Sequence, residues 1–285
     1  MIRDDFAVFI LTYGRANKVI THKTLKEAGY TGKIYTVCST DDTSIDEYKK
    51  LYKDNVLTFN KDDYVDDFDI GDNFSDMRVV VYARNALFDI AERIGVKYFL
   101  VLDDDYTAFN YRFDDKGDYC TTKIRQNLDN IFTSIIDYYK TIPALSIALA
   151  QGGDFIGGSE SSLAQTIKIK RKIMNSFFCS TERRFKFVGR INEDVNTYVS
   201  LGNVGKLMFQ TNQLSIEQRA TQSNSGGLTE FYLDKGTYIK SFYTIIYAPS
   251  CCKIGLMGNT NKRLHHVVQW KNAVSMILDA KYKKL

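Results

Sequence analysis

The stretch Tyr98–Asp105, YFLVLDDD, decides the fold class of this 285-residue chain. Its first five residues form an uninterrupted apolar run, which is typical of a strand buried on both faces of a sheet. Three aspartates follow directly, so this strand is expected to end at a polar edge. A second run, Phe6–Leu11 (FAVFIL), has the same character and leads into the glycine-containing loop Thr12–Arg15. The two runs indicate buried strands of an α/β sheet.

Strand and helix patterns alternate around these two runs. Further strands are expected at residues 33–38, 55–59 and 145–150, and helices at 19–28, 76–94 and 124–139. Within 76–94 the apolar residues recur at helical spacing, and Gly95 follows where glycine commonly ends a helix. The alternation predicts a mostly parallel sheet with helices covering both faces.

The pattern loosens after residue 150. Strands are expected at 185–188, 206–211 and 239–247, some of them antiparallel, and a helix at 264–278. The chain has only two prolines and no linker rich in proline, glycine or serine, so no internal boundary is visible. We therefore expect a single domain over residues 1–285, with an N-terminal half (1–150) and a mixed C-terminal half (151–285).

The overall composition excludes several classes of protein. A hydrophobic fraction of 44% and a charged fraction of 25% are typical of a globular chain, and a net charge of +4 is too small for a nucleic-acid coat protein. The five cysteines are scattered and lack a CxxC pair, which argues against a zinc site or a disulfide framework. No apolar run reaches the roughly 18 residues that span a membrane. We expect a soluble cytoplasmic protein without a membrane partner.

The three consecutive aspartates Asp103, Asp104 and Asp105 predict a divalent-metal site. Like charges this close repel one another, and a cation among them relieves the repulsion. Mg²⁺ and Mn²⁺ prefer carboxylate oxygens and leave positions open for substrate phosphates. In an extended turn Asp103 and Asp105 point the same way, so these two are the expected ligands, while Asp104 faces another group. The alternative is a polar cap after the strand.

Two of the three histidines, His265 and His266, are adjacent near the C-terminus. One of them is a candidate to complete the metal shell, because neutral imidazole is an acceptable ligand for Mn²⁺. The alternative is a surface pair beside Lys262 and Arg263.

Three polar segments follow predicted strands, namely Thr12–Arg15, Ser39–Asp42 and Asp103–Asp105. In open α/β sheets ligands bind beyond the carboxyl ends of the strands. The coincidence predicts one binding site at this edge of the sheet.

These segments together resemble a known family. The strand ending in TYGR, the strand ending in Asp41 and Asp42, the ARN sequence within the helix at 76–94 and the DDD run resemble GT-A nucleotide-sugar transferases. The sequence GRINED at 189–194 looks like the xED motif of that fold. Within the GT-A families the chain resembles the TET-associated group, which includes base-J-type DNA glucosyltransferases and phage enzymes that glycosylate hydroxymethyl-pyrimidines. The similarity extends from about Phe6 to Trp270.

The resemblance implies a Rossmann-like GT-A fold, in which residues 1–150 bind the nucleotide sugar and residues 151–285 bind the acceptor. It implies donor-binding roles for Thr12, Tyr13, Arg15, Asp41, Asp42, Arg84 and Asp104. It also implies that Asp103 and Asp105 form the DxD motif that holds Mn²⁺ or Mg²⁺, with His265 or His266 as a late ligand.

The same resemblance implies that Glu193 and Asp194 face the acceptor. Transfer needs a base for the acceptor hydroxyl, and Asp194 is the expected base, with Glu193 as the alternative. A base opposite the leaving group implies inversion at the anomeric carbon. Apart from the family, Glu193 and Asp194 read as first-turn acids of a helix, and Arg84 as the partner of Asp89 or another helix acid.

A basic stretch with interleaved phenylalanines suggests a DNA acceptor, because cations bind phosphates and aromatic rings stack on bases. The candidate DNA-binding residues are Lys170, Arg171, Lys172, Arg183 and Arg184, with Phe177, Phe178, Phe185 and Phe187 between or beside them. The alternative is a basic surface over phenylalanines that belong to the core.

The expected function is transfer of a sugar from a UDP-sugar to 5-hydroxymethylcytosine or a related hydroxymethyl-pyrimidine in DNA, as in phage DNA hypermodification in the host cytoplasm. Glucose and a pentose such as arabinose both suit the motifs. Two alternatives remain: transfer to a glycan, lipid or protein hydroxyl, and an inactive GT-A fold that serves as a nucleic-acid-binding module.

Overall fold

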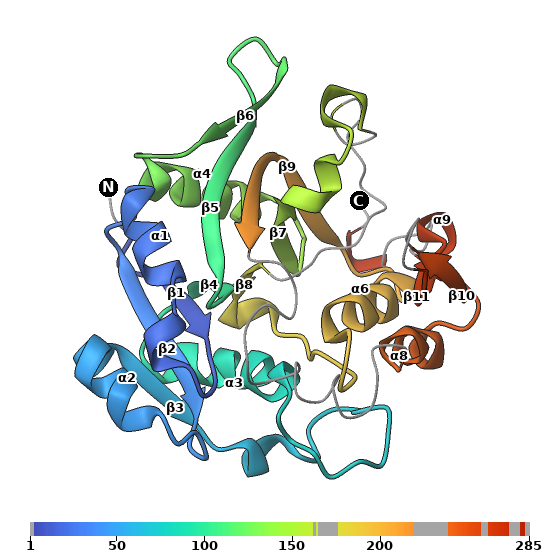
Figure 1. Cartoon of the computed structure of the whole chain (residues 1–285), viewed down its shortest axis with the longest axis horizontal. Helices are drawn as coiled ribbons and strands as arrows, with labels where there is room; N and C mark the ends of the chain where they lie inside the picture. The colour runs from blue at the N-terminus through green and yellow to red at the C-terminus, as the bar shows by residue number, and fades with distance from the viewer. Residues whose placement is uncertain are drawn as a thin grey trace.

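A central sheet organises the chain in the computed structural model, which describes residues 3–161, 164, 176–218, 239–257, 262–273 and 280–282. Within these residues the strand order is β3-β2-β1-β4-β8-β7-β9-β5-β6 (Figure 1). The strands are β1 (Phe6–Leu11), β2 (Lys33–Ser39), β3 (Val56–Phe59), β4 (Tyr98–Asp103), β5 (Tyr106–Phe113), β6 (Tyr119–Lys123), β7 (Ser146–Gln151), β8 (Phe177–Ser180) and β9 (Met208–Gln218). A separate hairpin joins β10 (Cys252–Met257) to β11 (Arg263–Val268).

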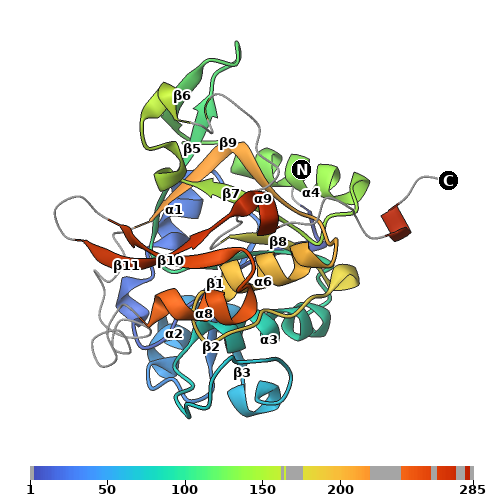
Figure 2. The ribbon, with the colours of Figure 1, turned by 90° about the vertical axis from the view of Figure 1, so that its right-hand side faces the viewer.

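Helices cover both faces of the sheet (Figures 1 and 2). In the described part of the chain they are α1 (Thr21–Glu27), α2 (Ile45–Tyr52), α3 (Val80–Arg93), α4 (Leu128–Thr141), α6 (Glu193–Asn203), α8 (Lys240–Tyr247) and α9 (Trp270–Ala273). Successive side chains of β1 alternate between two apolar cores. Phe9 packs with residues of α3 and α6, whereas Val8 and Ile10 pack with residues of α1 and α4. The expected sheet with two covered faces is confirmed.

The first four strands in the sheet order, β3, β2, β1 and β4, are parallel. The chain builds outward from β1 to β3 and then returns through α3 to β4 on the other side of β1. Leu11 at the end of β1 pairs with Asp103 at the end of β4. The strand order therefore reverses between β1 and β4, which is the place where open α/β sheets bind ligands.

The other half of the sheet is mixed. β8 is antiparallel to both β4 and β7, β9 runs parallel to β7, and β5 and β6 are antiparallel at the far edge. Strands from before and after residue 150 thus alternate within one sheet. In Figure 1 the β5–β6 hairpin extends away from the body of the sheet.

Three elements in the C-terminal half differ from the prediction, and two of them lie after residue 238. Residues 239–247 were expected as a strand but form helix α8, because the short apolar run is amphipathic with Tyr243 and Thr244 buried and Ile246 exposed. Residues 264–278 were expected as a helix, but the described part begins with β11, which pairs with β10 over Arg263–Val268. In Figure 2 this hairpin and α8 lie in front of α6.

The predicted strand at 185–188 is also wrong, and its place in the sheet is taken by β8. The backbone of the extended segment around Phe187 forms its hydrogen bonds with a side chain instead of a neighbouring strand. Asn85 Nδ2 donates to the carbonyl oxygen of Phe187 at 3.0 Å, and Phe187 N–H donates to Asn85 Oδ1 at 2.8 Å. The Asn85 amide thus replaces a strand partner and fastens this segment to α3.

Asn85→Ala is expected to lower the free energy of unfolding by about 3 kcal/mol, because both buried backbone groups of Phe187 lose their partner. The measurement is a urea titration of the wild type and the variant. Asn130→Ala, at an exposed position of α4, is the control and should change stability by much less. Equal effects of the two substitutions would show that the Asn85 amide contributes nothing specific.

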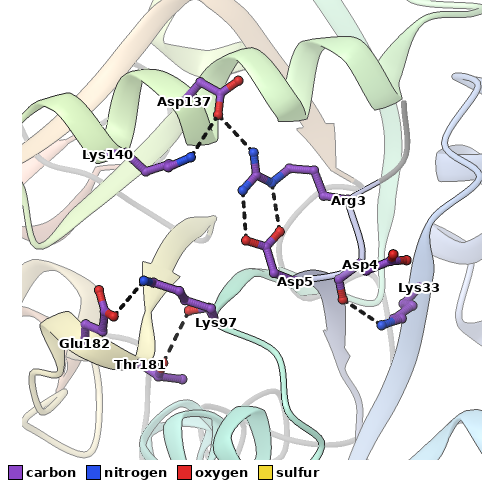
Figure 3. Close-up of polar contacts among 9 residues, drawn as sticks. All are labelled: Arg3, Asp4, Asp5, Lys33, Lys97, Asp137, Lys140, Thr181 and Glu182. Carbon is purple, nitrogen blue, oxygen red and sulfur yellow. Dashed lines mark hydrogen bonds and ion pairs between the residues drawn. The ribbon is translucent and has the colours of Figure 1, made fainter.

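The amino ends of the strands are closed by local ion pairs (Figure 3). Arg3 bridges Asp5 and Asp137, with nitrogen–oxygen distances of 2.9 Å to each. Lys97 pairs with Glu182 at 2.6 Å. At this edge the cations and carboxylates of these pairs neutralise each other.

In the described part of the chain, helices are too short or too polar to cross a bilayer. All five cysteines carry free thiols, and Cys120 alone among them is partly exposed.

Candidate active site

Thr12 and Asp104 join the carboxyl ends of β1 and β4. Thr12 Oγ1 donates to Asp104 Oδ2 at 2.6 Å, and Arg15 Nε lies 3.3 Å from the same oxygen. Burial raises the pKa of Asp104, while Arg15 and the Thr12 hydroxyl partly oppose the rise. Asp104 is buried, and these two contacts to its carboxylate hold the loop after β1 in place.

Asp41 and Asp42 at the end of β2 have different surroundings. Asp42 is buried, and its two oxygens accept hydrogen bonds from the backbone N–H groups of Gly14 and Ser44, both at 2.8 Å. Asp41 keeps a half-exposed carboxylate, which lies 2.9 Å from Lys61 Nζ and 3.4 Å from the Tyr13 hydroxyl. Asp42 therefore shapes the loop, and Asp41 is the one of the pair with a surface open to a ligand.

Arg84 connects the end of β4 to the start of α6. Its Nη1 lies 3.0 Å from Glu193 Oε1, and its Nη2 lies 3.6 Å from Asp103 Oδ1. Only 2% of its side chain is exposed, and the guanidinium carbon sits 5.0 Å from the ring centre of Phe177 and 5.6 Å from that of Phe187. The alternative ion pair with Asp89 is wrong, because these contacts take the guanidinium toward the site.

The charges around Arg84 shift one another's proton affinity. Burial raises the pKa of Asp103 to about 7, and the negative charges of Asp105, Asp104 and Glu193 add to the rise, although Arg84 opposes it. Burial also raises the pKa of Glu193, again against Arg84. A group of carboxylates that resists ionisation in this way is suited to receive a cation.

Glu193 and Asp194 occupy the first turn of α6 and at the same time lie beside Arg84. Both are buried. Asp194 Oδ1 accepts a hydrogen bond from Val195 N–H at 2.8 Å. The preceding residue, Asn192, has a left-handed backbone with φ of 56°, which turns the chain sharply into the helix. Glu193 and Asp194 are therefore both first-turn acids of α6 and members of the candidate site.

The hairpin β10–β11 brings His265 and His266 to this part of the molecule. Their ring centres lie 4.4 Å apart. His266 Nδ1 lies 3.4 Å from Asn192 Nδ2, directly beside the residue that precedes Glu193. Within the described residues, no three His, Cys, Asp or Glu side chains are close enough to form a complete metal site. Two carboxylates with open positions are nevertheless the usual protein contribution to a cation bound through phosphates.

Of the residues predicted to bind DNA, the two that the structure describes, Arg183 and Arg184, lie away from this edge. Arg183 Nη1 donates to the carbonyl oxygens of Tyr139, Ile142 and Ala144 at 2.8–3.0 Å, and Arg184 pairs with Asp89 and Glu92. Both follow β8 at the amino-end edge of the sheet, since Ser180 pairs with Tyr98. The phenylalanines Phe177, Phe178, Phe185 and Phe187 are core residues. Lys170, Arg171 and Lys172 lie outside the described residues.

Three further residues shape the site and were missed in the sequence. The Tyr48 hydroxyl lies 3.1 Å from Thr12 Oγ1 and accepts a hydrogen bond from Arg15 N–H. Lys61 holds Asp41 and lies over the Tyr13 ring, with 4.5 Å to its centre. Thr21 Oγ1 donates to the carbonyl oxygen of Asp103 at 2.7 Å. Their partners are distant in sequence, so local patterns carry no signal for them.

The arrangement has the parts that group transfer from a phosphate-bearing donor requires. The end of β4 carries carboxylates, the buried guanidinium of Arg84 lies between Asp103 and Glu193, and Glu193 and Asp194 begin α6 on the other side of that guanidinium. A model of the family described as TET-Associated Glycosyltransferase matches residues 6–227. That span contains the site residues named above except His265 and His266.

No curated protein matches the chain. The family match covers well over half of the sequence, and the mixed sheet with its parallel β3-β2-β1-β4 portion has the Rossmann-like arrangement of a GT-A fold. The chain belongs to the TET-associated glycosyltransferase family.

Proposed function

We propose that this glycosyltransferase moves a sugar from a UDP-sugar to the hydroxyl group of a hydroxymethyl-pyrimidine in DNA, with metal dependence and inversion at the anomeric carbon. The observation that carries the proposal is the position of Arg84 between Asp103 and Glu193. The guanidinium of Arg84 thereby links the end of β4, which suits a diphosphate, to the acids at the start of α6, which suit an acceptor.

Asp103 and Asp105 would hold Mn²⁺ or Mg²⁺, with His265 or His266 as a late ligand. The cation would neutralise the charge that develops on the departing nucleoside diphosphate. The chemistry of the donor set suits such a cation, because Asp103 and Asp105 supply hard carboxylate oxygens and the negative charge of Asp105 helps to raise the pKa of Asp103.

Arg84 would bind the diphosphate from its other side. Although burial opposes its charge, the carboxylates of Glu193, Asp103 and Asp194 hold the pKa of Arg84 above its ordinary value, so it stays cationic. The half-exposed carboxylate of Asp41 and the ring of Tyr13 would contact the nucleoside, while Thr12, Arg15, Asp42 and Asp104 keep the surrounding loops in place.

Asp194 would act as the base. Its carboxylate takes the proton of the acceptor hydroxyl as that oxygen bonds to the anomeric carbon, and the bond from this carbon to the donor phosphate breaks with its electron pair leaving on UDP. Glu193 is the alternative, but its 3.0 Å ion pair with Arg84 suits it to hold the guanidinium. Attack opposite the leaving group inverts the anomeric centre.

The test is mass spectrometry of nucleosides from duplex DNA that contains 5-hydroxymethylcytosine, after incubation with the protein, Mn²⁺ and a panel of UDP-sugars. A mass gain of one pentose or one hexose is expected, and its size identifies the sugar. Release of UDP without any gain on DNA would retain the donor site and assign the acceptor to a glycan, lipid or protein. Absence of both products would favour the inactive binding module.

The affinity for Mn²⁺ should depend on pH near neutrality. The pKa of Asp103 is about 7 without metal, so below this pH the carboxyl group is protonated and a cation must displace the proton. We expect the affinity to fall by roughly tenfold per pH unit below pH 7 and to level off above it. Titration of free Mn²⁺ by electron paramagnetic resonance without nucleotide measures this directly. A midpoint near pH 4 would contradict the expected competition.

A further inference from the structure

A loop segment ahead of α3, residues 69–74, runs beside the turn that leads into α6. The backbone N–H groups of Gly189 and Arg190 donate to the carbonyl oxygens of Asp69 and Ile70 at 2.8 and 2.9 Å. The Tyr247 hydroxyl of α8 donates to the same Asp69 oxygen at 2.9 Å. The segment is thus bound both to the turn and to the helix behind it.

The side chain of Arg190 adds a buried charge to this junction. Its Nε lies 3.0 and 2.7 Å from the two oxygens of Asp72, and its Nη2 donates to the carbonyl oxygen of Phe74 at 2.5 Å. The Tyr243 hydroxyl from α8 donates to Asp72 as well. Arg190 is 1% exposed, and its Nη1 has no hydrogen-bond partner among the described residues. Asp72 is therefore the main compensation for burying this cation.

We propose that Asp72 is a positioning residue for the transfer reaction, because through Arg190 and Tyr243 it fixes the turn that carries Glu193 and Asp194. The inference rests on the proposed function of that acid pair. Asp72 itself lies outside the candidate site and touches neither acid through any described contact.

The turn is held from its other side by α6 and α8. Asn196 Nδ2 donates to the carbonyl oxygen of Ile191 at 2.9 Å, and Asn192 Nδ2 donates to that of Lys240 at 2.8 Å. A Cβ added to Gly189 would meet Tyr247 at 2.9 Å, so the turn has no room to shift toward α8. The left-handed conformation of Asn192, two residues from Asp194, persists only where its surroundings hold it.

The pKa of Asp72 agrees with a stable ion pair between Asp72 and Arg190. Burial alone would raise the pKa of Asp72, but the hydrogen bonds from Arg190 and Tyr243 hold it below its ordinary value. The carboxylate is therefore ionised at neutral pH and paired with Arg190.

The test compares two substitutions of the same kind, Asp72 within this segment and Asp67 just before it. Asp72→Asn is expected to lower kcat for transfer by roughly 10²-fold, since a small misplacement of a catalytic group has an effect of this size. The KM for the UDP-sugar and the Mn²⁺-dependent affinity for UDP should stay within about twofold. Asp67→Asn is the matched control. It removes the ion pair of Asp67 with Lys186, which joins the same two regions at an exposed position, and should leave kcat unchanged.

Tyr243→Phe provides a second test if Asp72→Asn fails to fold. It keeps the Asp72–Arg190 pair and removes one hydroxyl contact, so a smaller loss of kcat at unchanged KM is expected. Thermal unfolding followed by circular dichroism confirms that each variant is folded.

Transfer by the wild-type chain is measured first in the same assay and decides the proposed function separately. If the wild type only hydrolyses the donor, the rate of hydrolysis takes the place of kcat. Equal rates for folded Asp72→Asn and Asp67→Asn overturn the positioning role, as does a loss that lies wholly in KM. An unchanged kcat in Tyr243→Phe overturns it where Asp72→Asn is unfolded.

Discussion

Asp103→Asn is expected to reduce sugar transfer by roughly 10³-fold and to abolish Mn²⁺-dependent binding of UDP, because a cation among the phosphates supplies several kcal/mol of transition-state stabilisation. The amide keeps the size of the side chain but removes the charge that attracts the metal. Calorimetry with UDP and Mn²⁺ measures binding, and nucleoside mass spectrometry measures transfer. Asp137→Asn, at an exposed carboxylate of the opposite edge, is the control and should retain both.

The same substitution should leave the metal-free protein at least as stable at pH 8. The pKa of Asp103 is raised to about 7 in the folded chain, so its ionised form destabilises the fold at a pH above that value. Removing the charge removes this cost, a trade between stability and activity that is common at active sites. An Asp103→Asn variant that retains metal-dependent UDP binding, or unfolds well below the wild type at pH 8, would contradict the assignment of this carboxylate to a cation.

Asp194→Asn is expected to lose transfer by roughly 10²- to 10⁴-fold, the usual contribution of a general base, while binding of UDP with Mn²⁺ is preserved. The asparagine oxygen can still accept the hydrogen bond from Val195 N–H, so α6 should begin as in the wild type. Transfer is measured in single-turnover experiments, which separate chemistry from product release.

Asp129→Asn is the matched control for Asp194→Asn. Asp129 is also an acid in the first turn of a helix, and its oxygens accept from the backbone N–H and hydroxyl of Thr31. Loss of a helix-terminal charge should affect both variants by about 1 kcal/mol or less in stability, but only Asp194→Asn should lose transfer. Retained transfer in Asp194→Asn would assign the base to Glu193, and Glu193→Gln would then be the variant to lose it.

The N-terminal half of the fold was predictable because its signals are local. Contiguous apolar runs identified β1, β2 and β4, and the helical repeat identified α3, although this helix begins at Val80 and not at residue 76. Alternation of strand and helix then implied the parallel sheet, and the polar residues after each strand implied its edge. The elements of this half that were not predicted are α2, β5 and β6.

The C-terminal half was less predictable for a physical reason. A short apolar run is compatible with a strand or a buried helix, and only its packing partner decides. Residues 240–247 became α8 because Tyr243 and Thr244 are covered by neighbours, whereas His265 and His266 lie in a strand because β10 pairs with them. Phe187 required no strand partner, since Asn85 supplied both hydrogen bonds from a position 102 residues earlier.

By itself the sequence determined which kinds of chemistry gather at the carboxyl ends of the strands, because strand ends and charge clusters are properties of neighbouring residues. Tertiary structure decided how the acids divide their roles. Asp104 accepts a hydrogen bond from Thr12, and Asp42 accepts hydrogen bonds from backbone N–H groups. Glu193 and Asp103 both contact the guanidinium of Arg84. Such assignments depend on burial and on partners that are distant along the chain, and folding alone brings these together.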